Sequence, residues 1–215
     1  MGYKTAAGYG CGEIVEKKSR FIGQAWPVKT EEEARAILEE TRKKYWDASH
    51  NVYAWRIGGV QRFSDDGEPS GTSGKPTLDV ITGAGLDNVM IIVTRYFGGT
   101  LLGTGGLVRA YTKGAQTALA AAGVLEKMVF VRGSLSMDYG FLSKVQYLTA
   151  KNGWHVEDTV YADQVTMRLV IAEAETQAFE KEITAASDGR LKVVWEGKTW
   201  GAKVPEGIRL FDDPI

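Results

Sequence analysis

The first half of the chain alternates hydrophobic and polar positions in a way that predicts a unit with both strands and helices. Thr30 and the three glutamates after it fit the capping box that begins a helix. The run Val89–Thr94 is unbroken, apolar and β-branched, which is typical of a strand buried on both faces. Two strands are predicted within residues 10–28 and a hairpin at 49–58 and 60–63, with helices from Thr30, at Leu78–Thr82 and at 107–123.

The second half repeats a simpler order of elements. Hydrophobic positions recur with helical spacing in two segments and alternate at Val165, Met167, Leu169 and Ile171. The predicted order is strand 129–137, helix 140–152, strands 154–161 and 165–171, helix 176–187 and strand 191–195. This βαββαβ order is the split-βαβ or ferredoxin-like unit. We therefore expect an α/β (α+β) protein with domains at 1–124 and 125–215, the second ending in an irregular tail from residue 196.

Composition narrows the classes of function. The net charge is −1 and no dense Lys/Arg cluster is present, so a strongly basic nucleic-acid binder is disfavoured. The single cysteine, Cys11, cannot form a disulfide within the chain. No apolar run is long enough to span a membrane, and the N-terminus lacks a secretion signal. We expect a cytoplasmic protein with no membrane partner.

Three polar segments of the first half could carry chemistry, and the first is Ser49-His50-Asn51. His50 is one of only two histidines and begins a predicted strand. A histidine in this place can act as a general base or a proton switch. It can equally anchor its own loop through hydrogen bonds, and without a named partner we favour the anchoring role.

The second segment, residues 64–76, is a long polar loop. Asp65, Asp66 and Glu68 could supply oxygen ligands to Mg²⁺ or Ca²⁺, although their spacing does not match an EF-hand. Asp and Ser side chains in such a loop more often satisfy the local backbone. A loop of this length and polarity is also typical of a binding element.

The third segment, residues 95–106, is rich in glycine and lies between a buried strand and a helix. Glycines let the backbone approach a ligand closely, and free N–H groups at a helix start favour an anion. The spacing matches neither a Walker A loop nor a dinucleotide fingerprint. Tight turns and close helix packing explain the same glycines, so both interpretations stay open.

Other catalytic and metal motifs are missing from the sequence. His50, His155 and Cys11 lie in different predicted elements, so we expect no tightly bound transition metal. No Gly-x-Ser-x-Gly elbow accompanies the serines of the acidic loop. We assign no catalytic residue and no cofactor.

These three segments together resemble a known family. The runs SHNVYAW, SDDGEPSGTSGKP and TRYFGGTLLGTGGLVRAY, in this order and spacing, closely resemble the signature of the IMPACT/YigZ family over about residues 8–123. The second half is similar to the additional C-terminal domain of the bacterial YigZ branch.

The resemblance implies a fold for each domain and a function in translation. The first domain would resemble the second domain of a small-subunit ribosomal protein, and the second a ferredoxin-like domain of elongation factor G. Eukaryotic members of the family regulate translation by interfering with activation of a kinase that phosphorylates an initiation factor. By analogy we expect a translation-related binding protein, with RNA, the ribosome or a translation protein as partner; the sequence does not decide the oligomeric state.

We favour this binding module over an enzyme that acts on a phosphorylated small molecule through the glycine-rich loop. Arginines would contact phosphate or carboxylate, and Tyr96 and Phe97 would offer stacking surfaces. Because paired strands return the chain to its start, the three segments should meet on one face, with Arg95 near Asp65 or Asp66. The candidate ligand- or partner-binding residues are His50, Asn51, Asp65, Asp66, Glu68, Arg95, Tyr96, Gly98, Gly99, Gly103, Gly105, Gly106 and Arg109.

Overall fold

The computed structural model describes residues 2–212, which form two compact units. One unit is Tyr3–Leu125, and the other runs from Glu126 onward and includes Gly2. Helices and strands are mixed in both units, so the predicted α+β class is confirmed. Within residues 2–212, no helix combines the length and apolar character that crossing a membrane requires.

The first unit is built on a five-stranded sheet with the order β2-β3-β6-β4-β5. Each neighbouring pair of strands is antiparallel. The elements are β1 (Tyr3–Ala6), β2 (Gly10–Glu16), β3 (Ser19–Pro27), α1 (Glu31–Lys44), β4 (His50–Ile57), β5 (Val60–Ser64), α2 (Gly74–Gly83), β6 (Val89–Tyr96) and α3 (Thr104–Ala122).

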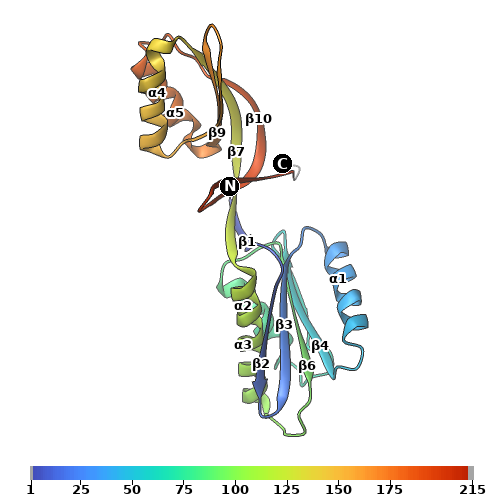
Figure 1. The fold of residues 1–215 in the computed structure, drawn as a ribbon. Coiled ribbons are helices and arrows are strands. Elements are labelled where there is room, and N and C mark those ends of the chain that lie inside the picture. Colours follow the sequence, from blue (N-terminus) through green and yellow to red (C-terminus); the bar gives the residue numbers. More distant parts are fainter. Residues whose placement is uncertain (1, 213–215) are drawn as a thin grey trace. The chain divides into compact units, whose positions relative to one another are not determined.

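Helices cover both faces of this sheet, with α2 and α3 on one face and α1 on the other (Figure 1). The central strand β6 is buried along nearly its whole length, as its apolar run predicts. Ile91 and Val93 pack toward α2 and α3, whereas Met90 and Ile92 pack toward α1. One half of the capping box forms, because the Thr30 hydroxyl accepts a hydrogen bond from the Glu33 N–H. The Glu33 carboxylate accepts from the Lys29 N–H, one residue before the position that the motif predicts.

Antiparallel pairing brings several loops to one end of this sheet. β2 and β3 are joined there by a two-residue turn, and His50 at the start of β4 pairs with Arg95 near the end of β6. We call this the loop end; it comprises residues 17–18, 45–49, 65–73 and 97–103. The arrangement does not follow the rule for parallel sheets, in which sites lie at the carboxyl ends of the strands.

Helix α2 begins four residues earlier than the sequence pattern indicated, at Gly74 rather than Leu78. The N-cap residue Ser73 makes no side-chain capping bond of its own. Instead, the Asp65 carboxylate accepts hydrogen bonds from the Ser73 and Gly74 N–H groups. A cap supplied from eight residues upstream leaves no signature in the local sequence.

The second unit confirms the ferredoxin-like βαββαβ order. Its sheet has the order β11-β10-β7-β9-β8, and α4 and α5 lie on one face (Figure 1). Leu135, Phe179 and Ile183 are buried between the helices and the sheet. The elements are β7 (Val124–Met137), α4 (Tyr139–Asn152), β8 (His155–Tyr161), β9 (Val165–Ala172), a 3₁₀ turn η1 (Glu173–Glu175), α5 (Thr176–Ala186), β10 (Val194–Val204) and β11 (Gly207–Phe211).

The expectation of an irregular tail is wrong for residues 196–211. The last predicted strand, 191–195, overlaps only the first two residues of β10, which begins at Val194, extends to Val204 and forms a hairpin with β11. Ile208 and Leu210 of β11 pack against Phe130 and Val170, on the sheet face away from the helices. A bulge between Trp195 and Gly197 interrupts the alternation that marks a strand. Residues 213–215 of the expected tail lie outside the described part.

Candidate functional site

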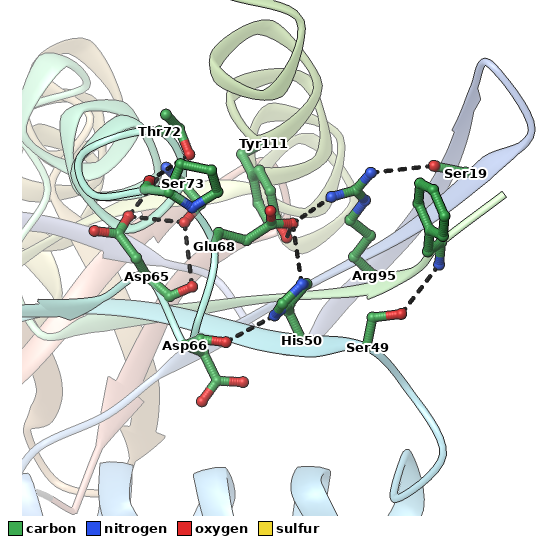
Figure 2. A network of polar contacts seen from close by, with 12 residues as sticks. Ser19, Ser49, His50, Asp65, Asp66, Glu68, Thr72, Ser73, Arg95 and Tyr111 are labelled. Carbon is green, nitrogen blue, oxygen red and sulfur yellow. Dashed lines mark hydrogen bonds and ion pairs between the residues drawn. The ribbon is translucent and has the colours of Figure 1, made fainter. Parts of the chain in front are cut away.

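The loop end of the first unit contains a buried ion pair. One Glu68 carboxylate oxygen, Oε1, lies 2.6 Å from Arg95 Nη1 and accepts a hydrogen bond from the Tyr111 hydroxyl at 2.7 Å (Figure 2). Only 8% of Glu68 and 5% of Arg95 is exposed, and Tyr111 is fully buried. A charged pair this deep is tolerated only when further hydrogen bonds accompany it, as they do here.

Arg95 extends this network to the β2–β3 turn and the glycine-rich loop. Its Nη2 lies 3.3 Å from the Ser19 hydroxyl, which also accepts a hydrogen bond from the Gly98 N–H. The guanidinium lies over the rings of Phe21 and Phe97. One arginine therefore connects three separate segments of the loop end.

Gly98 makes this connection possible by its lack of a side chain. A Cβ on Gly98 would lie 2.0 Å from the carbonyl carbon of Lys18, closer than any real contact. The glycine-rich loop thus packs backbone to backbone against the β2–β3 turn. This agrees with the close-packing interpretation of that glycine.

His50 anchors the acidic loop. Its Nδ1 lies 2.8 Å from the Asp66 carbonyl oxygen, and because a carbonyl can only accept, Nδ1 carries the proton. Its Nε2 lies 3.7 Å from Glu68 Oε1 (Figure 2). The anchoring role favoured from the sequence is the one that the contacts describe.

The two aspartates of the acidic loop have different partners. Asp66 accepts from the Asn51 N–H at 2.6 Å and pairs with Arg42 of α1 at 3.1 Å. Asp65 accepts from Ser73 and Gly74 at the start of α2, and from the Gly71 N–H. Arg95 therefore pairs with Glu68, and not with Asp65 or Asp66 as we expected.

The pKa values of Asp65 and Tyr111 are shifted by their surroundings in the network. Burial alone would raise the pKa of Asp65, but the N–H groups of Gly71 and Gly74 and both donors of Ser73 outweigh it and lower that pKa. Burial raises the pKa of Tyr111, and the adjacent Glu68 carboxylate raises it further. The Tyr111 hydroxyl thus keeps its proton and donates a hydrogen bond to Glu68.

The remaining candidate residues lie in three places. Tyr96 donates a hydrogen bond to Asp47 in the loop after α1. Gly99 and Gly103 adopt positive φ angles in the glycine-rich loop. Gly105, Gly106 and Arg109 lie in the first turns of α3, where Gly106 and Arg109 line a cavity separate from the buried network.

Ser19, Tyr111 and Arg42 take part in the network although the sequence interpretation did not select them. Tyr111 lies on the buried face of α3, and a buried tyrosine hydroxyl requires a partner, so the helical pattern offered a usable signal. Ser19 and Arg42 carry no such signal, because their partners depend on the loop conformations. Among residues 2–212, no group of three or more His, Cys, Asp or Glu side chains could hold a metal ion.

Large apolar side chains are exposed at the same end. Trp46 is 82% exposed, Leu101 is 81% exposed and Phe97 is 49% exposed. Two hydrogen bonds join the loops that carry Trp46 and Phe97: the Phe97 N–H donates to Ser49, and Tyr96 donates to Asp47. The loop end therefore combines a hydrogen-bonded polar interior, in which Arg95 Nε alone among the Arg95 nitrogens has no partner, with an apolar exterior.

Family models match both units. The Impact N-terminal domain matches residues 17–119, which include the whole network, and a domain of unknown function (DUF1949) matches residues 135–190. YvyE of Bacillus subtilis, named an IMPACT family member, is 38% identical over 191 residues, covering 87% of this chain and 88% of that protein. The chain belongs to the IMPACT family.

Further relatives agree. The IMPACT family member YigZ of Escherichia coli is 34% identical over 183 residues, covering 83% of this chain and 90% of that protein. Mouse Protein IMPACT is 34% identical over 98 residues, which cover 42% of this chain and 30% of that protein. A crystal structure described as a hypothetical protein matches with a TM-score of 0.58 and 32% identity, covering 90% of this chain and 96% of that one.

The capping role of Asp65 predicts a pH-dependent loss of stability in Asp65→Ala. The variant should lose about 1–2 kcal/mol of unfolding free energy at neutral pH, a typical value for a helix cap. Because the native pKa of Asp65 is lowered, its contribution is present above the unfolded pKa and is lost as pH falls through the native pKa. Denaturant unfolding from neutral to acid pH should therefore show the two proteins converging.

Asp79→Ala is the matched control, because Asp79 is an exposed α2 residue whose carboxylate pairs with Lys75 on the same helix. Its cost should stay within about 0.5 kcal/mol. A difference between Asp65→Ala and wild type that persisted undiminished in acid would contradict the capping account.

The buried pair predicts strong coupling between Glu68 and Arg95. Glu68→Leu or Arg95→Met alone leaves an uncompensated buried charge and should cost about 3–5 kcal/mol. The double variant should cost clearly less than the sum of the two, which urea unfolding of all four proteins would measure.

The exposed pair Glu13–Arg20 provides the comparison cycle. Glu13→Leu and Arg20→Met should show coupling close to zero, because solvent screens an exposed pair. Additive effects at Glu68 and Arg95 would show that the two side chains do not depend on each other.

Proposed function

We propose that this protein is a translation-related regulatory or binding protein whose first unit contacts a protein or RNA partner through the loop end. The observation that carries the proposal is that Trp46, Phe97 and Leu101 are exposed. A hydrogen bond from the Phe97 N–H to Ser49 fixes the loops that carry Trp46 and Phe97. Exposed apolar side chains on loops of fixed conformation are typical contact residues of protein interfaces, and aromatic ones also stack on bases. The translational setting comes from the family resemblance.

The buried network supports binding over catalysis at the loop end. Glu68, Arg95 and Asp65 direct their charged groups toward each other or toward backbone N–H groups. His50 is held by the Asp66 carbonyl. These groups fix loop positions, and a surface fixed before binding loses less conformational entropy on association.

An enzyme acting on a phosphorylated small molecule remains a second candidate because of one observation. The cavity beside the glycine-rich loop is lined by Lys17, Arg109 and Lys113. Cationic side chains beside a helix start suit a phosphate.

Binding to ribosomal particles tests the proposal. Purified protein should co-sediment with bacterial ribosomal particles, and Trp46→Ala/Leu101→Ala should weaken this by at least about fivefold, since interface hot spots contribute more than about 1 kcal/mol. Treating the particles with RNase before sedimentation separates RNA contacts from protein contacts. Tyr147→Ala, which removes an exposed aromatic residue from α4 of the second unit, should leave binding unchanged.

The proposal fails if wild-type protein does not co-sediment, or if the loop-end variant binds as well as wild type. Both variants change exposed side chains, so their unfolding midpoints should match wild type. A shifted midpoint in Trp46→Ala/Leu101→Ala would show a structural role for these residues and would also count against the proposal.

A further inference from the structure

A second feature of the first unit lies outside the buried network. A cavity of about 220 Å³ opens between the β2–β3 turn and the first turns of α3. In Figure 1 this is the end of the unit where the β2–β3 hairpin turn lies beside the loop that leads into α3. Its charged lining residues are Lys17, Arg109, Lys113 and Glu16.

The three cations of this cavity are unpaired. Within residues 2–212, the charged groups of Lys17, Arg109 and Lys113 form no ion pair or hydrogen bond, and all three residues are exposed. Arg109 and Lys113 are four residues apart on α3, so like charges lie on the same helix face. Such a pair is unfavourable in a free helix, and a bound anion would relieve the repulsion.

Lys17 is held in place by an unusual turn. Lys17 and Lys18 are the two residues between β2 and β3, with φ angles of 44° and 67°. Asn and Gly normally occupy such positions, because φ is positive at both. Gly98 packs against the backbone of this turn. The glycine-rich loop that follows Arg95 therefore also fixes the backbone position of Lys17.

The first turn of α3 leaves room for Arg109 beside the helix start. A Cβ on Gly105 would lie 3.5 Å from Arg109 Nη1, so the guanidinium folds back toward the N-terminal end of its own helix. The guanidinium can bind two oxygens of one phosphate, and Lys17 and Lys113 add point charges.

The size and charge of the cavity restrict the ligand. A pocket that encloses a whole small molecule typically measures about 300–1,000 Å³. A cavity of 220 Å³ suits a single phosphate group on a ligand that lies mostly outside it. Glu16, which also lines the cavity, opposes a doubly charged terminal phosphate more than a singly charged phosphodiester.

We propose that this cavity is a phosphate-binding site formed by Lys17, Arg109 and Lys113, and that a phosphodiester of single-stranded RNA fits it better than a free phosphate does. The exposed ring of Phe97, on the loop that leads into α3, provides a surface on which a base can stack. This inference deepens the proposed function by naming one contact of the loop end. It rests on that function only for the choice of RNA, and not for the phosphate site itself.

Two probes distinguish the sources of phosphate: a fluorescent oligouridylate followed by anisotropy, and pyrophosphate followed by calorimetry. Arg109→Gln/Lys113→Gln should weaken oligouridylate binding at least about tenfold and reduce the slope of log K against log salt by about 1.4, or about 0.7 per lost contact. Glu16→Gln should strengthen binding of both probes. Lys151→Gln/Lys181→Gln removes the same charge from the second unit and should leave binding unchanged.

The outcomes separate the two parts of the proposal. Pyrophosphate binding that is lost in Arg109→Gln/Lys113→Gln, without oligouridylate binding, supports the phosphate site and rules out RNA as its source. Equal binding by this variant and wild type, or no binding of either probe to wild type, overturns the site. Either result leaves the ribosome test of Trp46 and Leu101 standing, so failure here and failure of the proposed function are distinguishable.

Discussion

The buried pair of Glu68 and Arg95 is the interaction on which the loop end depends. It joins a loop that follows β5 to the end of the central strand β6, and Tyr111 connects both to α3. Because removing either charge leaves the other buried without compensation, this region has one strongly preferred arrangement. The pair thus specifies loop positions that the short, glycine-rich loops would not adopt reliably by themselves.

The exposed apolar residues and the cationic cavity are both positioned by the network around the Glu68–Arg95 pair. Arg95 reaches Ser19, and Ser19 and Gly98 hold the β2–β3 turn that presents Lys17. The same strand end leads into Phe97, whose N–H is bound by the loop that carries Trp46. Polar groups inside fix the backbone, and apolar and cationic groups outside remain available to a partner. This division of roles explains why the acidic loop contributes little charge to the surface.

The sequence predicted the meeting of His50, the acidic loop and Arg95, because a hairpin returns the chain to its start. It did not predict that Glu68, rather than Asp65 or Asp66, would pair with Arg95. That choice depends on positive φ angles at Asp66 and Gly67, which turn the next side chain inward. The start of α2 and the strand β11 were missed for a similar reason, since their partners are distant in sequence. Helices and strands that pack with a regular period can thus be predicted from the local sequence. Contacts between loops can be identified only once the fold is known.

Backbone hydrogen exchange at the loop end tests the central claim most directly. In the wild type, the N–H groups of Asn51, Gly74 and Gly98 should exchange more slowly than in an unstructured chain, because each donates to a side chain of the network. In Glu68→Gln, exchange at Asn51 and Gly98 should accelerate, while Ile92 in the middle of β6 remains protected. Unprotected loop N–H groups in the wild type, or exchange at these two residues that is unaffected by Glu68→Gln, would contradict the account.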